Sequence, residues 1–307
     1  YRARLQRQMC IRDRALAGQA ITLPERTHNL GDWHQALVQW LQNNGDERLP
    51  FWQAQQPDKA SAALPAYAEK QSATLSLDKA DTRRLLQDAP TKLGVSVPGL
   101  LLTALSRTLQ SSAAGASLVA RSATVGNRAA SDASAENKNL VINLEGHGRE
   151  TRLAPGMDLS RTLGWLTSLY PVSLPFSDDP RQNLFAVSQQ LQQTEPDGGV
   201  GYGALRFLAD SALNDSPDAP VTFNYLGQYH DDALIQGFTP LRGGGTAQAG
   251  DNPMASPLAI NGQVVGGQLE LVWEFASSVY DEQQIAHWCG RYRCLLYTSD
   301  AADELCS

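Results

Sequence analysis

The stretch Leu140–Glu150, "LVINLEGHGRE", decides the fold because an apolar run ends abruptly in a group of ionisable residues. Leu140–Leu144 predicts a buried β-strand, since a short apolar run bounded by turn residues is typical of a strand. Two glycines flank His147 and allow the backbone to turn sharply after the strand. Ionisable side chains at the end of a strand often line a cleft, so Glu145 and His147 are candidate functional residues.

The same turn has a simpler interpretation, in which it is solvated and carries only an ion pair. Arg149 would then pair with Glu145 or Glu150, and exposed ion pairs of this kind contribute little to stability or function. Residue spacing alone leaves both interpretations open.

Hydrophobic spacing predicts further elements along the chain. Helices are expected at 31–44, 47–55, 79–89, 96–110, 181–194, 202–212 and 281–292, and strands at 72–78, 169–174 and 221–226. Pro257–Phe275 predicts two strands around a turn at Asn261–Gly262, because Asn-Gly is a strong hairpin signal. Residues 111–139 are rich in Ala and Ser and predict a surface insertion. This mixture predicts an α/β fold with a mixed, largely antiparallel sheet and flanking helices.

Composition limits the possible partners. The formal net charge of −7 argues against nucleic acid, which needs clustered Lys and Arg. No apolar run approaches the length that crosses a bilayer, and the N-terminus lacks the apolar region of a signal peptide. The four cysteines have no zinc-site spacing, so we expect free thiols in a reducing, cytoplasmic location.

Both ends of the sequence are unusual. "RQMCIRDR" (Arg7–Arg14) and "CLLYTSDAADE" (Cys294–Glu304) resemble translated sequencing-adapter read-through. We therefore expect residues 1–14 and 294–307 to be non-native and the natural protein to be longer.

Four motifs occur in order along the chain: "NLEGHGRE", "RTLGWLTSLYPVSL", "GVGYGALRFL" and "VTFNYLGQY". Together they resemble the signature motifs of epimerization domains of non-ribosomal peptide synthetases, in the condensation-domain superfamily. The resemblance runs from about Leu23 to Tyr292. The Gly-His-Gly form of the first motif distinguishes epimerization domains from condensation domains that form amide bonds. The glycines of the third motif do not follow a phosphate-loop pattern, and we expect a loop that opens a helix in which Tyr202 packs.

The resemblance implies a fold of two chloramphenicol-acetyltransferase-like lobes that face each other across a tunnel. A carrier protein would insert its 4'-phosphopantetheine arm, bearing an L-aminoacyl or peptidyl thioester, and the enzyme would remove and return the α-proton without a metal or a redox cofactor of its own. Residues 15–62 would be a remnant of the first lobe and a linker, and residues 63–293 the second lobe.

The resemblance also assigns roles to residues. Glu145 would be the acid/base of the second lobe, and burial would raise its pKa toward working pH. Asn224 and Tyr225 would donate hydrogen bonds to the developing oxyanion, unless one of them packs, because neighbouring strand residues point to opposite faces. His147 would be either catalytic or structural.

One family motif is missing. The first lobe of these domains carries His-His-x-x-x-Asp-Gly, and none of the five histidines in this chain are adjacent. We therefore expect that the chain begins downstream of that motif. Most of the first lobe, its partner within the domain, would then be missing, and the chain alone would be inactive. Two alternatives remain at this point, namely a condensation domain that forms amide bonds and a non-catalytic module that docks carrier proteins.

Overall fold

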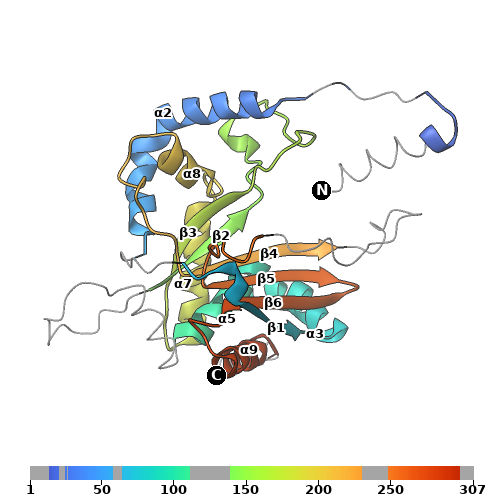
Figure 1. Ribbon diagram of the computed structural model, residues 1–307, viewed down its shortest axis with the longest axis vertical. Helices are drawn as coiled ribbons and strands as arrows, with labels where there is room; N and C mark the ends of the chain where they lie inside the picture. Colours follow the sequence, from blue (N-terminus) through green and yellow to red (C-terminus); the bar gives the residue numbers. More distant parts are fainter. Residues whose placement is uncertain are drawn as a thin grey trace, which may run out of the picture.

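The computed structural model describes residues 14–20, 25, 27–57, 64–110, 139–229 and 248–297. Its centre is a six-stranded β-sheet with the strand order β1-β6-β5-β4-β2-β3 (Figure 1). The strands are β1 (Lys70–Ser76), β2 (Leu140–Gly146), β3 (Ser168–Leu174), β4 (Val221–Tyr229), β5 (Leu258–Val265) and β6 (Gln268–Ala276). The expected insertion, apart from residue 139, lies outside the described residues.

The sheet is mixed. Strand β1 pairs with β6, β5 with β6 and β2 with β3 in antiparallel fashion, whereas β2–β4 and β4–β5 are parallel. Strand β1 joins the sheet at β6, with Lys70 opposite Ala276 and Ser76 opposite Glu270. The expected α/β fold with a mixed, largely antiparallel sheet is therefore confirmed.

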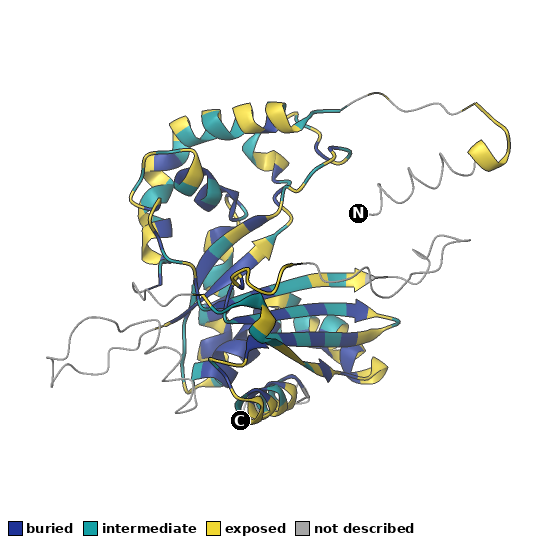
Figure 2. Cartoon of the chain, in the orientation of Figure 1, coloured by how far each residue is buried: buried dark blue, intermediate teal, exposed yellow. Residues whose placement is uncertain are grey.

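Helices cover one face of this sheet and bury the main hydrophobic core. They are α3 (Lys79–Arg83), a π-helical turn (Arg84–Asp88), α4 (Ala89–Leu93), α5 (Val97–Gln110), α7 (Pro180–Thr194) and α9 (Glu282–Tyr297). Figure 2 shows buried residues alternating with more exposed ones along β5 and β6, the pattern of a sheet with one covered face. Helix α5 is almost wholly buried because α7 and α9 pack against it.

A second, smaller group of elements packs on β3. Helix α2 (Leu30–Ala54) and helix α8 (Val200–Phe207) lie together above the sheet in Figure 1. Trp52 of α2 is fully buried, and its ring lies 5.7 Å from that of Tyr170 and 5.5 Å from that of Tyr202. The expectation that Tyr202 packs is confirmed.

Helix α2 is one helix, whereas the sequence predicted two, at 31–44 and 47–55. Asn29 is its N-cap, and Asp32 completes a capping box by accepting the Asn29 backbone N–H at 2.7 Å. The helix continues through Gly45 and Pro50 because side chains before and after them, Leu41 and Trp52, pack into the same cluster with α8. Tertiary packing thus outweighs the local helix-breaking residues.

The predicted turn at Asn261–Gly262 is wrong. Both residues lie within β5, and the turn between β5 and β6 falls at Gly266 and Gly267, with φ angles of 57° and 82°. A two-residue hairpin turn of this kind needs positive φ at both positions, which two glycines supply without strain. Asn261 stays extended because it pairs with β4 on one side and β6 on the other.

Several other elements differ from the predictions only at their ends. Strand β2 extends beyond Leu144 to Gly146, and helix α8 begins and ends earlier than expected. Helix α9 continues to Tyr297, past the predicted boundary at residue 293, and its Leu296 is only 4% exposed in the main core.

Candidate functional site

The two faces of the sheet separate packing residues from chemical ones. In β2, Leu140, Ile142 and Leu144 belong to the main core, so Glu145 points to the opposite face. Val141 and Asn143 are buried on that face, but it is open at Glu145, which is exposed. Strand β4 lies beside β2 in parallel, with Leu144 paired to Phe223 of the core. The next residues of the two strands, Glu145 and Asn224, are therefore neighbours on the open face.

A hydrogen bond joins these two predicted site residues. Asn224 Nδ2 donates to Glu145 Oε2 at 2.8 Å, although the residues are 79 positions apart in sequence. The Glu145 side chain reaches solvent, yet its surroundings displace part of its hydration, and this desolvation raises the pKa of its carboxyl group. The amide donor alone would favour the ionised form, so desolvation is the stronger effect. A carboxylate of raised pKa is suited to accept a proton.

Tyr225 lies on the other side of the sheet. Its ring packs against the main core, and burial raises the pKa of its hydroxyl group. A Cβ atom on the cross-strand neighbour, Gly262, would lie 3.4 Å from the Tyr225 ring and 3.2 Å from Leu271, another core residue. The structure therefore brings Glu145 and Asn224 together but places the Tyr225 side chain among packing residues.

His147 is part of a tight turn. Its ring is 69% exposed, and its Nδ1 accepts the backbone N–H of Arg149 at 2.9 Å. Gly148 has a φ of 65°, and a Cβ atom there would lie 1.4 Å from the carbonyl oxygen of Leu166. The glycine is thus required by the close approach of two backbone segments.

The charged residues after His147 anchor this turn. Glu150 pairs with Arg152 at 2.7 Å and lies 3.5 Å from His147 Nε2. Arg149 donates to the backbone carbonyl oxygens of Leu159 and, at 3.1 Å, Thr162. These contacts connect Arg149 to the following loop and Glu150 to Arg152. The ion pair of Arg149 with Glu145 or Glu150 stays a prediction.

Asp197 is a buried residue that sequence reasoning did not identify. It is 0% exposed, and it accepts hydrogen bonds from Arg48 Nε at 2.8 Å, from Trp52 Nε1 at 3.1 Å and from the backbone N–H of Gly199 at 3.0 Å. It therefore ties α2 to the loop that opens α8. Its position directly before the glycines of "DGGVGYG" was the available signal.

An open groove of about 330 Å³ lies between α2, α8 and the start of β3. Its walls include Trp33, Trp165, Phe207 and Ser168, and Trp165 is 96% exposed. Ser168 pairs with Gly146, and a Cβ atom at Gly146 would meet Ser168 Oγ and the Tyr170 ring, so the groove lies on the helix-covered side of the sheet and Glu145 on the other side.

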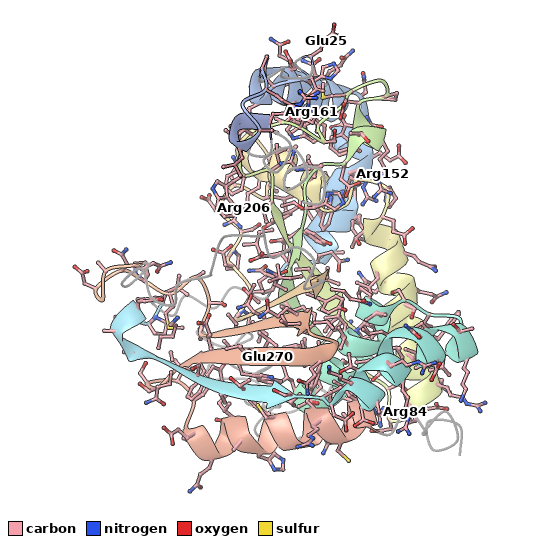
Figure 3. The ribbon with its side chains drawn as sticks, turned by 90° about the vertical axis from the view of Figure 1, so that its right-hand side faces the viewer. Glu25, Arg84, Arg152, Arg161, Arg206 and Glu270 are labelled. Atoms are coloured by element: carbon pink, nitrogen blue, oxygen red, sulfur yellow. The ribbon has the colours of Figure 1, made fainter. Side chains whose placement is uncertain are left out.

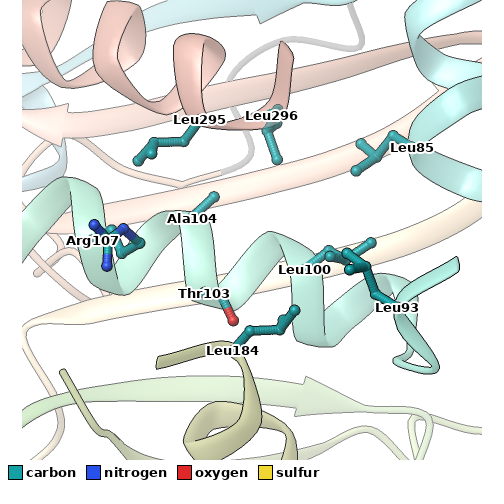
Figure 4. Close-up of a pocket in the computed structure, with 9 residues that line it drawn as sticks. All are labelled: Leu85, Leu93, Leu100, Thr103, Ala104, Arg107, Leu184, Leu295 and Leu296. Carbon is teal, nitrogen blue, oxygen red and sulfur yellow. The ribbon is translucent and has the colours of Figure 1, made fainter. Parts of the chain in front are cut away.

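A second cavity is unrelated to this site. It measures about 30 Å³ and is lined mainly by leucines of the helices that cover the sheet, together with Thr103, Ala104 and Arg107 of α5 (Figure 4). These helices cover the face of the sheet opposite to Glu145, so the cavity lies away from the candidate site.

Membrane spans and metal sites are the other features that could indicate a function. Within the described ranges, no helix is long and apolar enough to cross a membrane. Across the same part of the chain, no group of three or more His, Cys, Asp and Glu side chains is placed to hold a metal ion.

The chain is similar in sequence to a known protein family and to peptide synthetases. A model of the family described as "Condensation domain" matches residues 133–299, more than half of the chain. Tyrocidine synthase 1 of Brevibacillus parabrevis is 30% identical over 306 residues, with 91% of this chain and 26% of that protein covered. The chain therefore spans about a quarter of the length of this relative.

Two solved structures extend the comparison. The epimerization domain from the third module of tyrocidine synthetase B matches with a TM-score of 0.74 and 27% identity, over 94% of this chain and 62% of that one. The condensation domain from Monacolin K polyketide synthase matches with a TM-score of 0.61 and 14% identity, over 96% of this chain and 66% of that one, which shows a shared fold. The expected chloramphenicol-acetyltransferase-like lobe is thereby confirmed.

Proposed function

This chain belongs to the condensation-domain family, and from that premise we propose that it is the second lobe of an epimerization domain in a non-ribosomal peptide synthetase. The substrate is an L-aminoacyl or peptidyl thioester on the 4'-phosphopantetheine arm of a carrier protein, and the product carries the D residue. The observation that carries the proposal is the hydrogen-bonded pair of Glu145 and Asn224. The 27% identity with the tyrocidine epimerization domain supports it.

The proposed chemistry is a proton transfer in two steps. Glu145 accepts the α-proton, the C–H electron pair moves into the thioester, and an enolate oxygen develops negative charge. Asn224 has two amide N–H groups, of which one holds Glu145. The other is available to donate to the enolate oxygen. A donor in the preceding lobe returns a proton to the opposite face, so the reaction needs no metal or redox cofactor.

The other predicted site residues take supporting roles in this proposal. Tyr225 packs against the core and fixes the position of β4, so that Asn224 faces the carboxylate. His147 holds the turn after β2 by accepting the Arg149 N–H. The division into residues 15–62, from the first lobe and a linker, and 63–293, from the second lobe, is part of the same proposal.

The test uses a complete domain, made by joining this chain to the preceding lobe of the tyrocidine epimerization domain. With a carrier protein loaded with an L-aminoacyl group, exchange of the α-proton is measured in D₂O. The substitution Glu145→Gln should lower the exchange rate by about 10²- to 10⁴-fold, the usual contribution of a general base. The affinity for the carrier protein should stay unchanged.

Glu270→Gln is the matched control, since Glu270 (labelled in Figure 3) is a carboxylate of β6, two strands away from Asn224 of β4 in the sheet. Normal exchange by Glu145→Gln would exclude Glu145 as the base. Carrier binding by the wild-type domain without any exchange would favour the docking module. Amide formation with a second carrier-bound amino acid, without α-proton exchange, would favour the condensation alternative. The 307-residue chain alone should show no exchange, because it contains no paired histidines.

A further inference from the structure

Asn261 lies directly beside the proposed catalytic pair. In the parallel register of β4 and β5, Asn224 pairs with Asn261 and the core residue Phe223 pairs with Ile260. Paired residues of neighbouring strands point to the same face, so Asn261 shares the open face with Asn224 and Glu145. Three strands thus present one carboxylate and two amides in a row.

The Asn-Gly pair is unusual inside a strand, because both residue types are poor strand formers. Gly262 has a structural explanation, since a side chain there would crowd Tyr225 and Leu271 on the covered face. Asn261 faces the other way and is half-buried, whereas the alternate positions Leu258, Ile260 and Val264 are core residues. A local departure from strand preference, next to a reactive group, is typical of a functional position.

The surroundings of Asn261 on the open face are small or polar along β5 and include one valine on β6. Its neighbours along β5 on this face are Ala259 and Gln263, and across β6 it pairs with Val272. The Asn261 side chain has no hydrogen bond to any residue that the structure describes. This surface suits a peptide backbone better than a large apolar side chain.

We propose that Asn261 is a positioning residue that hydrogen-bonds to the amide group next to the reacting α-carbon of a peptidyl thioester. The inference rests on the proposed function. Neighbouring strands are about 4.8 Å apart, so the Asn261 backbone lies roughly 5 Å from that of Asn224 and about 10 Å from that of Glu145. A peptide advances about 3.3–3.6 Å per residue, so the amide beside an α-carbon held at Glu145 falls within reach of Asn261.

The chemistry of the asparagine side chain selects the substrate class. Its carbonyl oxygen accepts and its NH₂ group donates, which matches the N–H and C=O of a peptide bond. A free α-ammonium group, as in an aminoacyl thioester, only donates hydrogen bonds. It would therefore use the Asn261 carbonyl oxygen and leave the NH₂ group without an acceptor. Asn261 therefore favours peptidyl over aminoacyl substrates.

The experiment measures α-proton exchange by the complete domain with carrier-bound dipeptidyl and aminoacyl thioesters. Asn261→Ala should raise KM for the dipeptidyl substrate about 5- to 10-fold, as expected for losing one hydrogen bond. The kcat value should stay within about twofold, because the lost contact exists in ground state and transition state alike. KM for the aminoacyl substrate should rise by less than about twofold.

Gln263→Ala is the matched control, on the same strand and face one pleat further along. It should leave both KM values unchanged. Thermal unfolding of each variant shows whether the substitution has disturbed the sheet. Equal KM values of Asn261→Ala and wild type for the dipeptidyl substrate overturn the inference. Absence of exchange by the wild-type domain refutes the proposed function instead. The experiment therefore distinguishes failure of the Asn261 proposal from failure of the proposed function.

Discussion

At position 145 the folded chain places a carboxyl group where part of its hydration is lost. Burial raises its pKa above the ordinary value, so the folded state binds this proton more tightly than the unfolded state does. Ionisation of Glu145 near neutral pH therefore destabilises the fold. Such a cost is common where a residue is retained for chemistry rather than for packing.

The substitution Glu145→Gln should therefore stabilise the protein at neutral pH, by up to about 0.5 kcal/mol for a solvent-reaching side chain. The amide oxygen of Gln can still accept from Asn224. Below the unfolded-state pKa, both states of the wild type hold the proton, and the two proteins should be equally stable. The stability gain of Glu145→Gln should grow as pH rises from the unfolded-state pKa to the folded-state pKa of Glu145, and then stay constant. Urea unfolding between pH 4 and pH 8 measures it, and a loss of stability at pH 7 would contradict it.

Residue-level patterns predicted the site in part. The motifs identified Glu145 and Asn224, and the structure joins them. Strict alternation in β4 requires Asn224 and Tyr225 to point to opposite faces, so only one of them can accompany the carboxylate. Asn261 was hidden by its turn-like dipeptide, and Asp197 by the sequence distance to its partners Arg48 and Trp52.

At the scale of elements, the strongly periodic segments were predicted well. Strand β2 and helices α5 and α7 follow from apolar residues at strand or helix spacing, together with the cap at Ser96, whose Oγ accepts the Gly99 N–H at 3.2 Å. Errors arose where tertiary contacts override local preference. Helix α2 passes through Gly45 and Pro50 because α8 packs along it, and β5 passes through Asn261–Gly262 because it pairs on both sides.

Two glycines of helix α8 differ in the space around them, and alanine substitutions test this difference. Gly203 faces the groove, and a Cβ atom there meets no heavy atom within 4 Å. Gly203→Ala should therefore stabilise the protein by about 0.5–1 kcal/mol, because glycine is a poor helix former. Thermal or urea unfolding measures the change.

Gly201→Ala is the matched comparison on the same helix. A Cβ atom at Gly201 would lie 2.4 Å from Asp197 Oδ2 and 2.6 Å from the Trp40 ring. Overpacking of this kind should cost about 1–3 kcal/mol. If both alanine variants have the same stability, the packing described for α8 is incorrect.

At the scale of the whole molecule, two groups of elements meet at β3. The main core lies between the sheet and its helices, and the α2–α8 group is joined to the rest through Trp52, Tyr170 and Asp197. Asp197 accepts from Arg48 and Trp52 of α2 and from the Gly199 N–H at the start of α8. One carboxylate thus holds α2 to the start of α8, and Trp52 carries the contact on to Tyr170 of β3.

Substitution of Asp197 should loosen this joint. Asp197→Ala leaves a buried indole N–H and the half-buried Arg48 without their acceptor, which should cost about 2–4 kcal/mol. Asp197→Asn keeps one acceptor oxygen and should cost less. Urea unfolding, followed by tryptophan fluorescence, reports the loss at Trp52. A cost below about 1 kcal/mol for the alanine variant would show that Asp197 does not hold α2 in place.

The pairing of β1 with β6 also determines how the chain can fold during synthesis. Lys70–Ser76 finds its neighbour in the sheet about two hundred residues later, at Glu270–Ala276. At about 5–20 residues per second, a ribosome needs roughly 10–40 s to make the intervening sequence. During that time β1 stays without its neighbour and α5 without the cover of α9. Contacts of such high sequence separation fold slowly, so the nascent chain presents an incomplete sheet to chaperones until its last strand emerges.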